Sequence, residues 1–338
     1  MKETLHAEAW KGLFEAAFRI KDMAPWEWMV ETDLFGIRDG GETCYVSVMG
    51  NLGEHLGIAV YRGDEALSRF LEIRDIPEET IMEYPELLLQ IPQLQLSFEN
   101  REDLQEWDRR LIRAMGYRVR GGQAWPLFQS YRPGFMPWRL ELDEIPVLTR
   151  ALEQLEDVAP RARAGAFLLD IEEREDMLVR ARTADGVWVD ERVPIPTQEP
   201  SIIDLRWDGR DMTRLKKTPM AGDSIELDFF MFPGSIGKPS QRPAVAYVLL
   251  AVHRKSGMPL FADLLPVEES LEHVFGRIPH SLLARLAAVP MRPKEIRVQN
   301  HFLVNLLEPV MKELGTKIVH QSPLKTLRAV KSGLTGIL

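Results

Sequence analysis

The sequence has very little cysteine and no long apolar run. Cys44 is the single cysteine among 338 residues, so the chain can form no internal disulfide. No stretch of about 18 apolar residues is present, which argues against a transmembrane helix. The N-terminal residues lack the apolar centre of a signal peptide. We therefore expect a cytoplasmic protein without a membrane partner.

The usual motifs of metal sites and nucleophilic enzymes are missing as well. The 7 histidines show no His-x-His or His-Glu-x-x-His spacing, and one cysteine excludes a Cys-x-x-Cys pair. No Gly-x-Ser-x-Gly sequence is present. Cys44 lies in an apolar segment without an activating partner nearby, so we predict a buried strand residue rather than a nucleophile. The sequence thus predicts no metal site and no cofactor.

Charge is distributed unevenly along the chain. The formal net charge is −9. From Arg206 to the C-terminus there are 19 Lys and Arg against 12 Asp and Glu, which leaves +7, and the remaining 23 and 39 leave −16 in the first part. This asymmetry indicates two domains and suits an anionic partner for the second. Alternatively the two halves attract each other, and we favour this second interpretation.

Hydrophobic periodicity predicts a mixed α/β first half. Residues 5–21 form a helix with one continuous apolar face, made of Trp10, Leu13, Phe14, Ala17 and Phe18. Strands are expected over 34–38, 43–49, 56–61 and 93–98. Asp64 and Asn100 are placed to cap the helices that follow them, the second over 101–115. A proline- and aromatic-rich segment over 125–138, a helix over 143–158 and a hairpin turning at Asp185-Gly186 follow.

The second half predicts three strands followed by alternating helices and strands. The strands are expected over 223–232, 244–253 and 259–264, and then come helix 268–287 with a break near Pro279, strand 295–298, helix 301–314, strand 317–319 and helix 324–333. This order predicts one mixed sheet with helices packed on it, and it is similar to that of the ribonuclease H-like fold. The first half shows a similar order. We expect an α+β domain over 1–140, a connecting helix and β-hairpin over 141–215, and a C-terminal domain over 216–338.

The similarity to ribonuclease H-like nucleases implies where catalytic carboxylates would lie. These nucleases hold two divalent ions with acidic residues on the first strand, on the first helix and at the end of the fourth strand. Asp228 and Glu226 fit the first strand, and Glu269 and Glu272 fit the first helix. The fourth strand, however, ends in Gln299 and Asn300, whose neutral amides add no negative charge. The expected site is therefore degenerate.

Two further segments contain candidate binding residues. The aromatic segment can line a recognition groove, although we favour an ordered loop that packs over the core. In the last predicted helix three basic residues recur every third position, and they can contact phosphates or form a solvated face near the helix C-terminus. The binding candidates are Trp125, Tyr131, Trp138, Lys325, Arg328 and Lys331.

Several motifs along the chain are similar to those of one protein family. They are Trp10-x-x-Leu13-Phe14, the 48–54 loop leading to Gly57-x-x-x-Tyr61-x-Gly63, the 130–138 segment with its Pro-Gly-aromatic-x-Pro-Trp core, and Pro293-x-x-Ile296-x-Val298 with Leu314-Gly315. In these motifs the chain resembles bacterial proteins that consist of one N-terminal and one C-terminal domain of unknown function. The resemblance covers most of the chain and implies no activity.

We therefore expect a binding or interaction protein rather than an enzyme. The alternative is a nucleic-acid-associated protein whose second domain is a degenerate ribonuclease H-like domain. A protein partner fits the first interpretation and a nucleic acid fits the second, which we favour less.

Overall fold

The computed structural model describes residues 2–53, 55–172, 174–197, 203–238 and 240–335, and it consists of two compact units. Unit 1 comprises Met1–Ile81, Leu87–Arg132 and Pro137–Glu199, and unit 2 comprises Met82–Glu86, Pro133–Met136 and Pro200–Leu338. Two short segments of the first half therefore belong to unit 2. Among the described helices, none combines the length and the apolar character that crossing a membrane requires.

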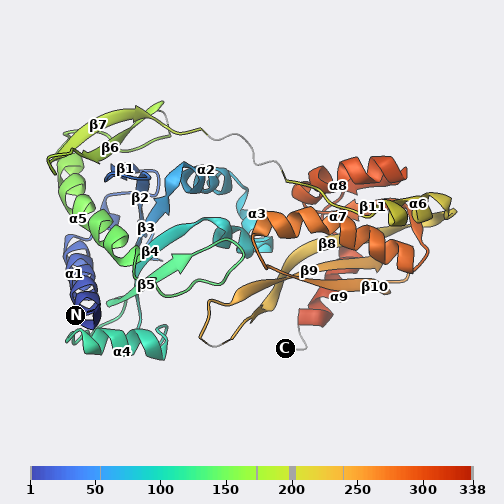
Figure 1. Cartoon of the computed structure of the whole chain (residues 1–338), viewed down its shortest axis with the longest axis horizontal. Helices are drawn as coiled ribbons and strands as arrows, with labels where there is room; N and C mark the ends of the chain where they lie inside the picture. Colours follow the sequence, from blue (N-terminus) through green and yellow to red (C-terminus); the bar gives the residue numbers. More distant parts are fainter. Residues whose placement is uncertain (1, 54, 173, 198–202, 239, 336–338) are drawn as a thin grey trace. The chain divides into compact units, whose positions relative to one another are not determined.

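Unit 1 contains a seven-stranded sheet in the order β5-β4-β3-β2-β1-β6-β7 (Figure 1). β1 to β5 pair antiparallel in sequence order, and β6 joins β1 in parallel. The strands are β1 Phe35–Arg38, β2 Cys44–Met49, β3 Gly57–Arg62, β4 Gln93–Glu99, β5 Trp125–Tyr131, β6 Asp176–Arg182 and β7 Trp188–Pro194. The helices are α1 Lys2–Met23, α2 Gly63–Arg74, α4 Glu106–Ala114 and α5 Glu144–Arg163, with a short 3-10 helix over Pro25–Glu27. The helix α3 Glu78–Glu83 and the 3-10 helix Pro85–Gln90 each have residues in both units.

Alternating side chains give the sheet of unit 1 two apolar faces. Val46 and Val60 point to the face where α1 and α5 pack, and the predicted stripe of α1, with Leu13 and Phe14, is buried there. The neighbouring residues Tyr45 and Tyr61 point to the other face and meet α2. This alternation is the period-2 pattern of a strand, and it confirms the amphipathic first helix.

Unit 2 contains a five-stranded sheet in the order β10-β9-β8-β11-β12. β9 is antiparallel to both β8 and β10, whereas β11 runs parallel to β8 and β12. Its elements are α6 Gly209–Lys217, β8 Met220–Ile236, β9 Ala244–His253, β10 Pro259–Pro266, α7 Leu271–Ala288, β11 Arg292–Val298, α8 His301–Leu314, β12 Lys317–His320 and α9 Lys325–Thr335. Both units thus show the predicted order of three antiparallel strands followed by helix–strand–helix units. The ribonuclease H-like assignment of unit 2 stays a prediction.

The predicted capping residues of two helices in unit 1 were wrong. α4 begins at Glu106, after a reciprocal capping box in which Gln105 and Asp108 bind each other's backbone N–H groups. Asn100 instead accepts a hydrogen bond from the backbone of Gln123. α2 begins at Gly63, so Asp64 lies inside it. The Asp64 carboxylate accepts a hydrogen bond from the hydroxyl of Tyr45. Asn100, Asp103 and Gln105 all precede α4, and only tertiary contacts decide which one caps it.

Two proline-containing segments also differ from the predictions. The loop expected at 125–138 begins with β5, an edge strand that pairs with β4 and contains Pro126. An edge strand has one open side, so a missing N–H is tolerated there. The expected break at Pro279 does not occur, because α7 continues through it and Phe275, Ile278 and Leu282 remain buried. Packing of this apolar face compensates for the one lost hydrogen bond.

Residues 141–215, which we expected to connect the domains, contribute to both units. They supply α5, β6 and β7 to unit 1 and α6 to unit 2. The β6–β7 hairpin turns at Asp185-Gly186 as predicted, with Gly186 at φ +82°. Gly134 lies in one of the short segments of unit 2, and its φ is +82°. A Cβ at Gly134 would lie 2.6 Å from a methyl group of Val267, which explains the glycine of the Pro-Gly motif.

Candidate functional site

The two carboxylates predicted on the first strand of unit 2 lie under the last helix. On β8, Glu226, Asp228 and Phe230 point to the face that α9 covers, whereas Phe229 points to the other face and meets Phe275 of α7. Glu226 is 2% exposed and Asp228 is 0% exposed. Buried carboxylates require partners, so their surroundings decide what they can do.

Asp228 is held by an ammonium group, a phenol and a backbone amide. Lys331 of α9 places its Nζ 3.1 Å from Oδ2, and the hydroxyl of Tyr84 donates to Oδ1 at 3.0 Å. The N–H of Phe229 donates to the same Oδ1. Burial raises the pKa of Asp228, and the Lys331 ammonium opposes this shift. Burial likewise raises the pKa of Tyr84, so this phenol remains protonated. The carboxylate therefore has both charge balance and hydrogen bonds.

Lys331 also packs on aromatic rings. Its ammonium lies 3.9 Å from the ring centroid of Phe230 and 5.4 Å from that of Tyr84. Its side chain is 23% exposed. The aromatic faces and the carboxylate together hold the cation in place.

Glu226 binds the backbone at the start of α9. Its Oε2 accepts the N–H of Leu327 at 2.7 Å, and its Oε1 lies 3.9 Å from the guanidinium of Arg254. The first turn of a helix has free N–H groups and a positive dipole end, and both favour a carboxylate there. Glu226 therefore fastens α9 to the centre of the sheet.

Gln299, at the end of β11, connects α9 with the segment Met82–Glu86. Its amide nitrogen donates to Glu83 at 2.8 Å and to the hydroxyl of Tyr84 at 2.9 Å. Its amide oxygen accepts the N–H of Leu324 at 3.2 Å. A carboxylate cannot donate, so the neutral amide suits this position. Asn300 has a separate role, because it caps α8 through the N–H of Phe302.

Glu86 completes the same cluster from the short segment. Its Oε1 accepts the N–H of Met231 at 2.9 Å, where the pairing of β8 with β9 becomes irregular. Burial raises the pKa of Glu86. Sequence reasoning missed Glu83, Tyr84 and Glu86, since they lie far from β8 along the chain. We found no sequence signal that could have indicated them.

The two acidic candidates of the first helix do not join this cluster. Glu269 precedes α7, is exposed and pairs with His273 at 3.1 Å. Glu272 lies in the first turn of α7, which packs on the opposite face of the sheet from Asp228. Within the part of the chain that the structure describes, no three His, Cys, Asp or Glu side chains are placed to hold a metal ion.

The three basic candidates of α9 have different environments. Lys325 is exposed. Arg328 pairs with Glu83 at 3.1 Å, and Lys331 binds Asp228. Two of the three cations are therefore engaged with carboxylates of unit 2.

The aromatic candidates belong to unit 1 and are half-buried. Trp125 and Tyr131 lie at the two ends of β5, and a guanidinium from Arg101 lies 5.9 Å from the ring centroid of Trp125. Burial raises the pKa of Tyr131 to about 12. Trp138 pairs its backbone with Ser130, at the far end of the strand from Trp125. The three rings form no single cluster among the contacts that the structure shows.

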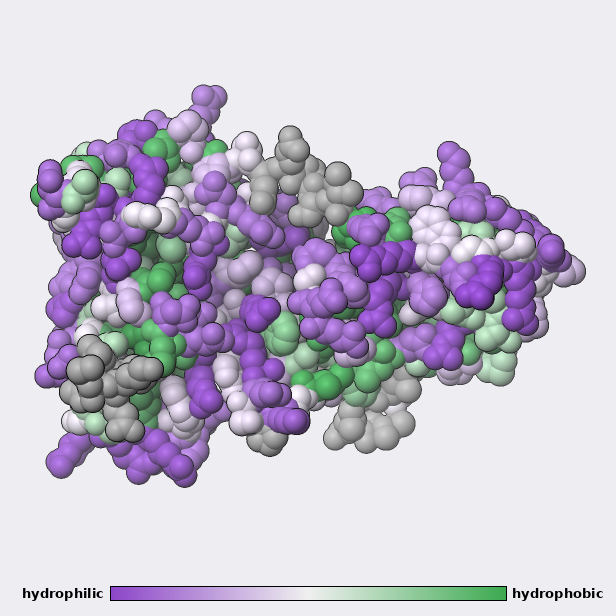
Figure 2. Space-filling view, viewed as in Figure 1, coloured by the Kyte–Doolittle hydropathy of each residue, from purple (hydrophilic) through white to green (hydrophobic). Residues whose placement is uncertain are grey.

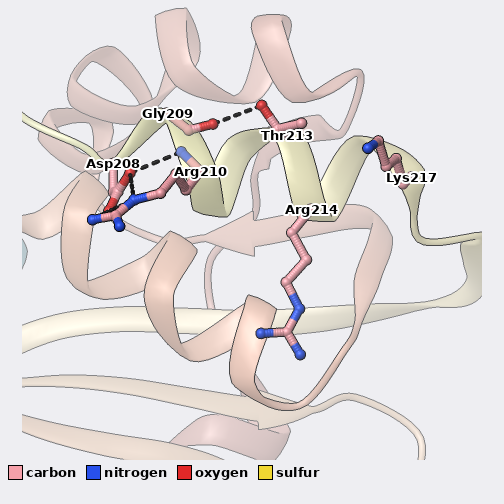
Figure 3. Close-up of a pocket in the computed structure, with 6 residues that line it drawn as sticks. All are labelled: Asp208, Gly209, Arg210, Thr213, Arg214 and Lys217. Carbon is pink, nitrogen blue, oxygen red and sulfur yellow. Dashed lines mark hydrogen bonds and ion pairs between the residues drawn. The ribbon is translucent and has the colours of Figure 1, made fainter.

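A separate surface of exposed basic residues follows α6. A depression of about 640 Å³ is lined by Asp208, Gly209, Arg210, Thr213, Arg214 and Lys217. Figure 3 draws these six residues. Asp208 caps the helix by accepting the N–H of Arg210, and it also binds the Arg210 side chain. Arg214 and Lys217 extend away from Asp208 in Figure 3, and both are exposed. We call Arg210, Arg214 and Lys217 the α6 basic face.

Two family models match the chain, and both describe domains of unknown function. Residues 211–335 match the model described as Domain of unknown function (DUF6930), and residues 10–180 match the model described as Domain of unknown function (DUF7309). These findings confirm the expected two-domain resemblance. No curated protein matches the chain. Because the match to residues 10–180 covers more than half of the sequence, the chain belongs to the family of the domain of unknown function DUF7309.

Proposed function

We propose that this chain is a non-catalytic binding or interaction protein of the cytoplasm. The observation that carries the proposal is the ammonium of Lys331 at 3.1 Å from the buried Asp228. In a ribonuclease H-like nuclease, carboxylates at this position hold divalent ions that bind the attacking and leaving oxygens. The strand order of unit 2 supports that comparison.

An ammonium group can balance the charge of the carboxylate but cannot replace the metal ion in catalysis. It offers only N–H donors and has no open coordination position for a water or a phosphate oxygen. The other oxygens of the cluster are engaged as well, since Glu226 binds the backbone of α9 and Gln299 binds Glu83 and Leu324. A divalent ion would have to displace α9 to reach these groups.

Cleavage assays on the full chain test this proposal. We expect no cleavage of single- or double-stranded DNA or RNA in Mg²⁺ or Mn²⁺, and no Mn²⁺ binding by calorimetry. Asp228→Asn should leave this result unchanged, as should the matched control Asp223→Asn, which removes a less buried carboxylate from the same strand. Divalent-dependent cleavage that is lost in Asp228→Asn and kept in Asp223→Asn would refute the proposal.

The α6 basic face favours a second candidate function, which is association with nucleic acid. Arg210, Arg214 and Lys217 are exposed on one helix, and the residues from Arg206 onward have a surplus of positive charge. Such a face suits backbone phosphates, whose binding weakens as salt rises.

Fluorescence anisotropy with short labelled DNA and RNA tests the second candidate. Binding by the full chain should weaken strongly between about 50 and 200 mM salt, and Arg214→Ala with Lys217→Ala should reduce the salt slope by about one for each lost contact. Lys325→Ala is the matched control, because it removes an exposed cation from α9. An absence of binding at low salt would exclude this candidate.

A further inference from the structure

An apolar groove lies at the end of the unit 2 sheet where α7 stops. Its volume is about 400 Å³, and it is lined mainly by Pro219, Ala221, Met258, Leu260, Val289 and Met291. These residues come from the ends of β8, β10 and α7 and from the entry to β11. Because α7 ends at Ala288, the apolar side chains beyond it remain uncovered by this helix.

The exposure of these side chains is high for large apolar residues. Met258 is 59% exposed and Val289 is 49% exposed. Clustered apolar side chains at a surface mark interaction sites more often than scattered ones do. Methionine also adapts its shape to different partners, because its side chain is unbranched and polarizable. The groove volume lies within the range of about 300–1,000 Å³ that is usual for ligand sites.

Fixed positive charge adjoins the groove. Arg292 lines it and is anchored by the backbone oxygens of Lys216, at 3.2 Å, and Leu314, at 2.7 Å. The Nε of Arg292 is buried without a hydrogen-bond partner among the described residues. Lys217 of the α6 basic face precedes the groove residue Pro219 by two positions.

Asp223, which follows the groove residue Ala221 by two positions, is already engaged. Asp223 pairs with His253 at 3.4 Å and with Lys255, so it does not offset Arg292 or Lys217. Figure 2 shows hydrophobic side chains next to hydrophilic ones at the end of unit 2 where Figure 1 draws α6. The surface therefore combines an apolar groove with positive charge beside it.

We propose that this groove binds an apolar peptide segment flanked by acidic residues of a partner protein. The proposal rests on the binding function proposed above and specifies its partner by chemistry. The apolar lining favours two or three large aliphatic or aromatic side chains, and the positive charge favours carboxylates beside them. A nucleic acid would use the basic face but would leave the apolar groove empty.

A random-peptide display selection on the full chain provides the probe. We expect enriched peptides to contain large apolar residues next to Asp or Glu. Synthetic copies of the enriched peptides should bind Met258→Glu at least tenfold more weakly than the unaltered chain, because the new carboxylate occupies the groove. Leu264→Glu is the matched control, since Leu264 is 53% exposed on β10, the strand that follows Met258, and does not line the groove. It should leave binding unchanged.

The outcomes separate the groove from the binding function. Peptides that bind Met258→Glu and the unaltered chain equally well would refute peptide binding at the groove. The proposed function as a binding protein would still stand. A selection that enriches no peptides, or enriches basic ones, would refute the proposed acidic peptide partner. Nucleic-acid binding in the anisotropy assay would then indicate that the α6 basic face binds phosphates. Lys217→Glu should selectively weaken peptides with acidic flanks, and an unchanged affinity would refute the role of positive charge. Metal-dependent cleavage would instead refute the proposed function itself.

Discussion

Replacement of Lys331 by methionine should destabilise unit 2 through the buried Asp228. Methionine keeps an unbranched apolar side chain, so the change chiefly removes the ammonium that lies 3.1 Å from the carboxylate and 3.9 Å from the ring centroid of Phe230. Loss of one partner of a buried ion pair costs roughly 3–5 kcal/mol, because the other charge is left uncompensated. We expect a loss of about 3 kcal/mol at neutral pH, near the lower end of this range, because the Lys331 side chain is 23% exposed.

A second substitution should largely rescue the first. Asp228→Asn alone should cost about 1–2 kcal/mol, since Lys331 can turn its ammonium towards water while the asparagine oxygen still accepts from Tyr84. In the double variant neither member of this pair leaves an uncompensated buried charge, so its loss should be smaller than that of Lys331→Met alone. The difference measures the coupling between the two side chains.

The loss in Lys331→Met should also depend on pH. Burial already raises the pKa of Asp228, and removal of the ammonium raises this pKa further. A carboxyl whose folded pKa exceeds its unfolded pKa contributes stability that is fully present below the unfolded value of about 3.9 and is lost as pH rises through the folded value. The variant should therefore fall further behind the unaltered chain between pH 5 and pH 8, by up to about 1.4 kcal/mol for each pH unit.

Hydrogen exchange at the amides of β8 and α9 is the assay for these variants. Every tryptophan except Trp207 lies in unit 1, so intrinsic fluorescence would report mainly on the wrong unit. Circular dichroism during urea unfolding provides the total loss. A cost below about 1 kcal/mol for Lys331→Met, or a cost that is the same at pH 5 and pH 8, would refute the assigned role of the ion pair.

Three other substitutions test neighbouring features. Gly134→Ala should destabilise unit 2 by about 1–3 kcal/mol in thermal unfolding, because of its positive φ and the 2.6 Å approach to Val267, and Val267→Ala should relieve part of this loss. Glu86→Gln keeps an oxygen that accepts the N–H of Met231. Because burial raises the pKa of the Glu86 carboxyl, the variant should gain stability in urea unfolding relative to the unaltered chain as pH rises from 5 to 8. The same stability difference between the two proteins at pH 5 and pH 8 would contradict this. Tyr84→Phe should cost about 1–3 kcal/mol in urea unfolding, because it removes a hydroxyl that both donates and accepts, and a neutral effect would show that water replaces it.

Most of the secondary structure could be predicted from the sequence, because periodicity is a local property. The ranges of β9, Ala244–His253, and of α8, His301–Leu314, agree with the predicted ones to the residue. Both have continuous apolar patterns with clear turn or cap residues at their ends. The start of α4 could not be predicted in the same way, because Asn100 is the commoner type of cap and only the contacts show that Gln105 caps the helix.

The candidate site could be predicted only where its residues belong to a regular strand. Glu226 and Asp228 share a face of β8 because they are two residues apart, and Gln299 follows the last residue of β11. Tyr84 and Lys331 are 144 and 103 residues from Asp228 along the chain. Neither periodicity nor spacing places two such distant segments beside one strand, so the partners of the carboxylate required the structure.

The neutral amide of Gln299 and the ammonium of Lys331 both limit the net negative charge of the cluster. The cluster contains three ion pairs, Asp228 with Lys331, Glu226 with Arg254, and Glu83 with Arg328. Gln299 lies among these groups and adds no charge while donating to Glu83. A carboxylate at this position would add a further negative charge beside Glu83 and Asp228, which a buried site can hold only with another cation. The amide leaves one cation for each of Asp228, Glu226 and Glu83, while Glu86, whose pKa burial raises, accepts the backbone N–H of Met231.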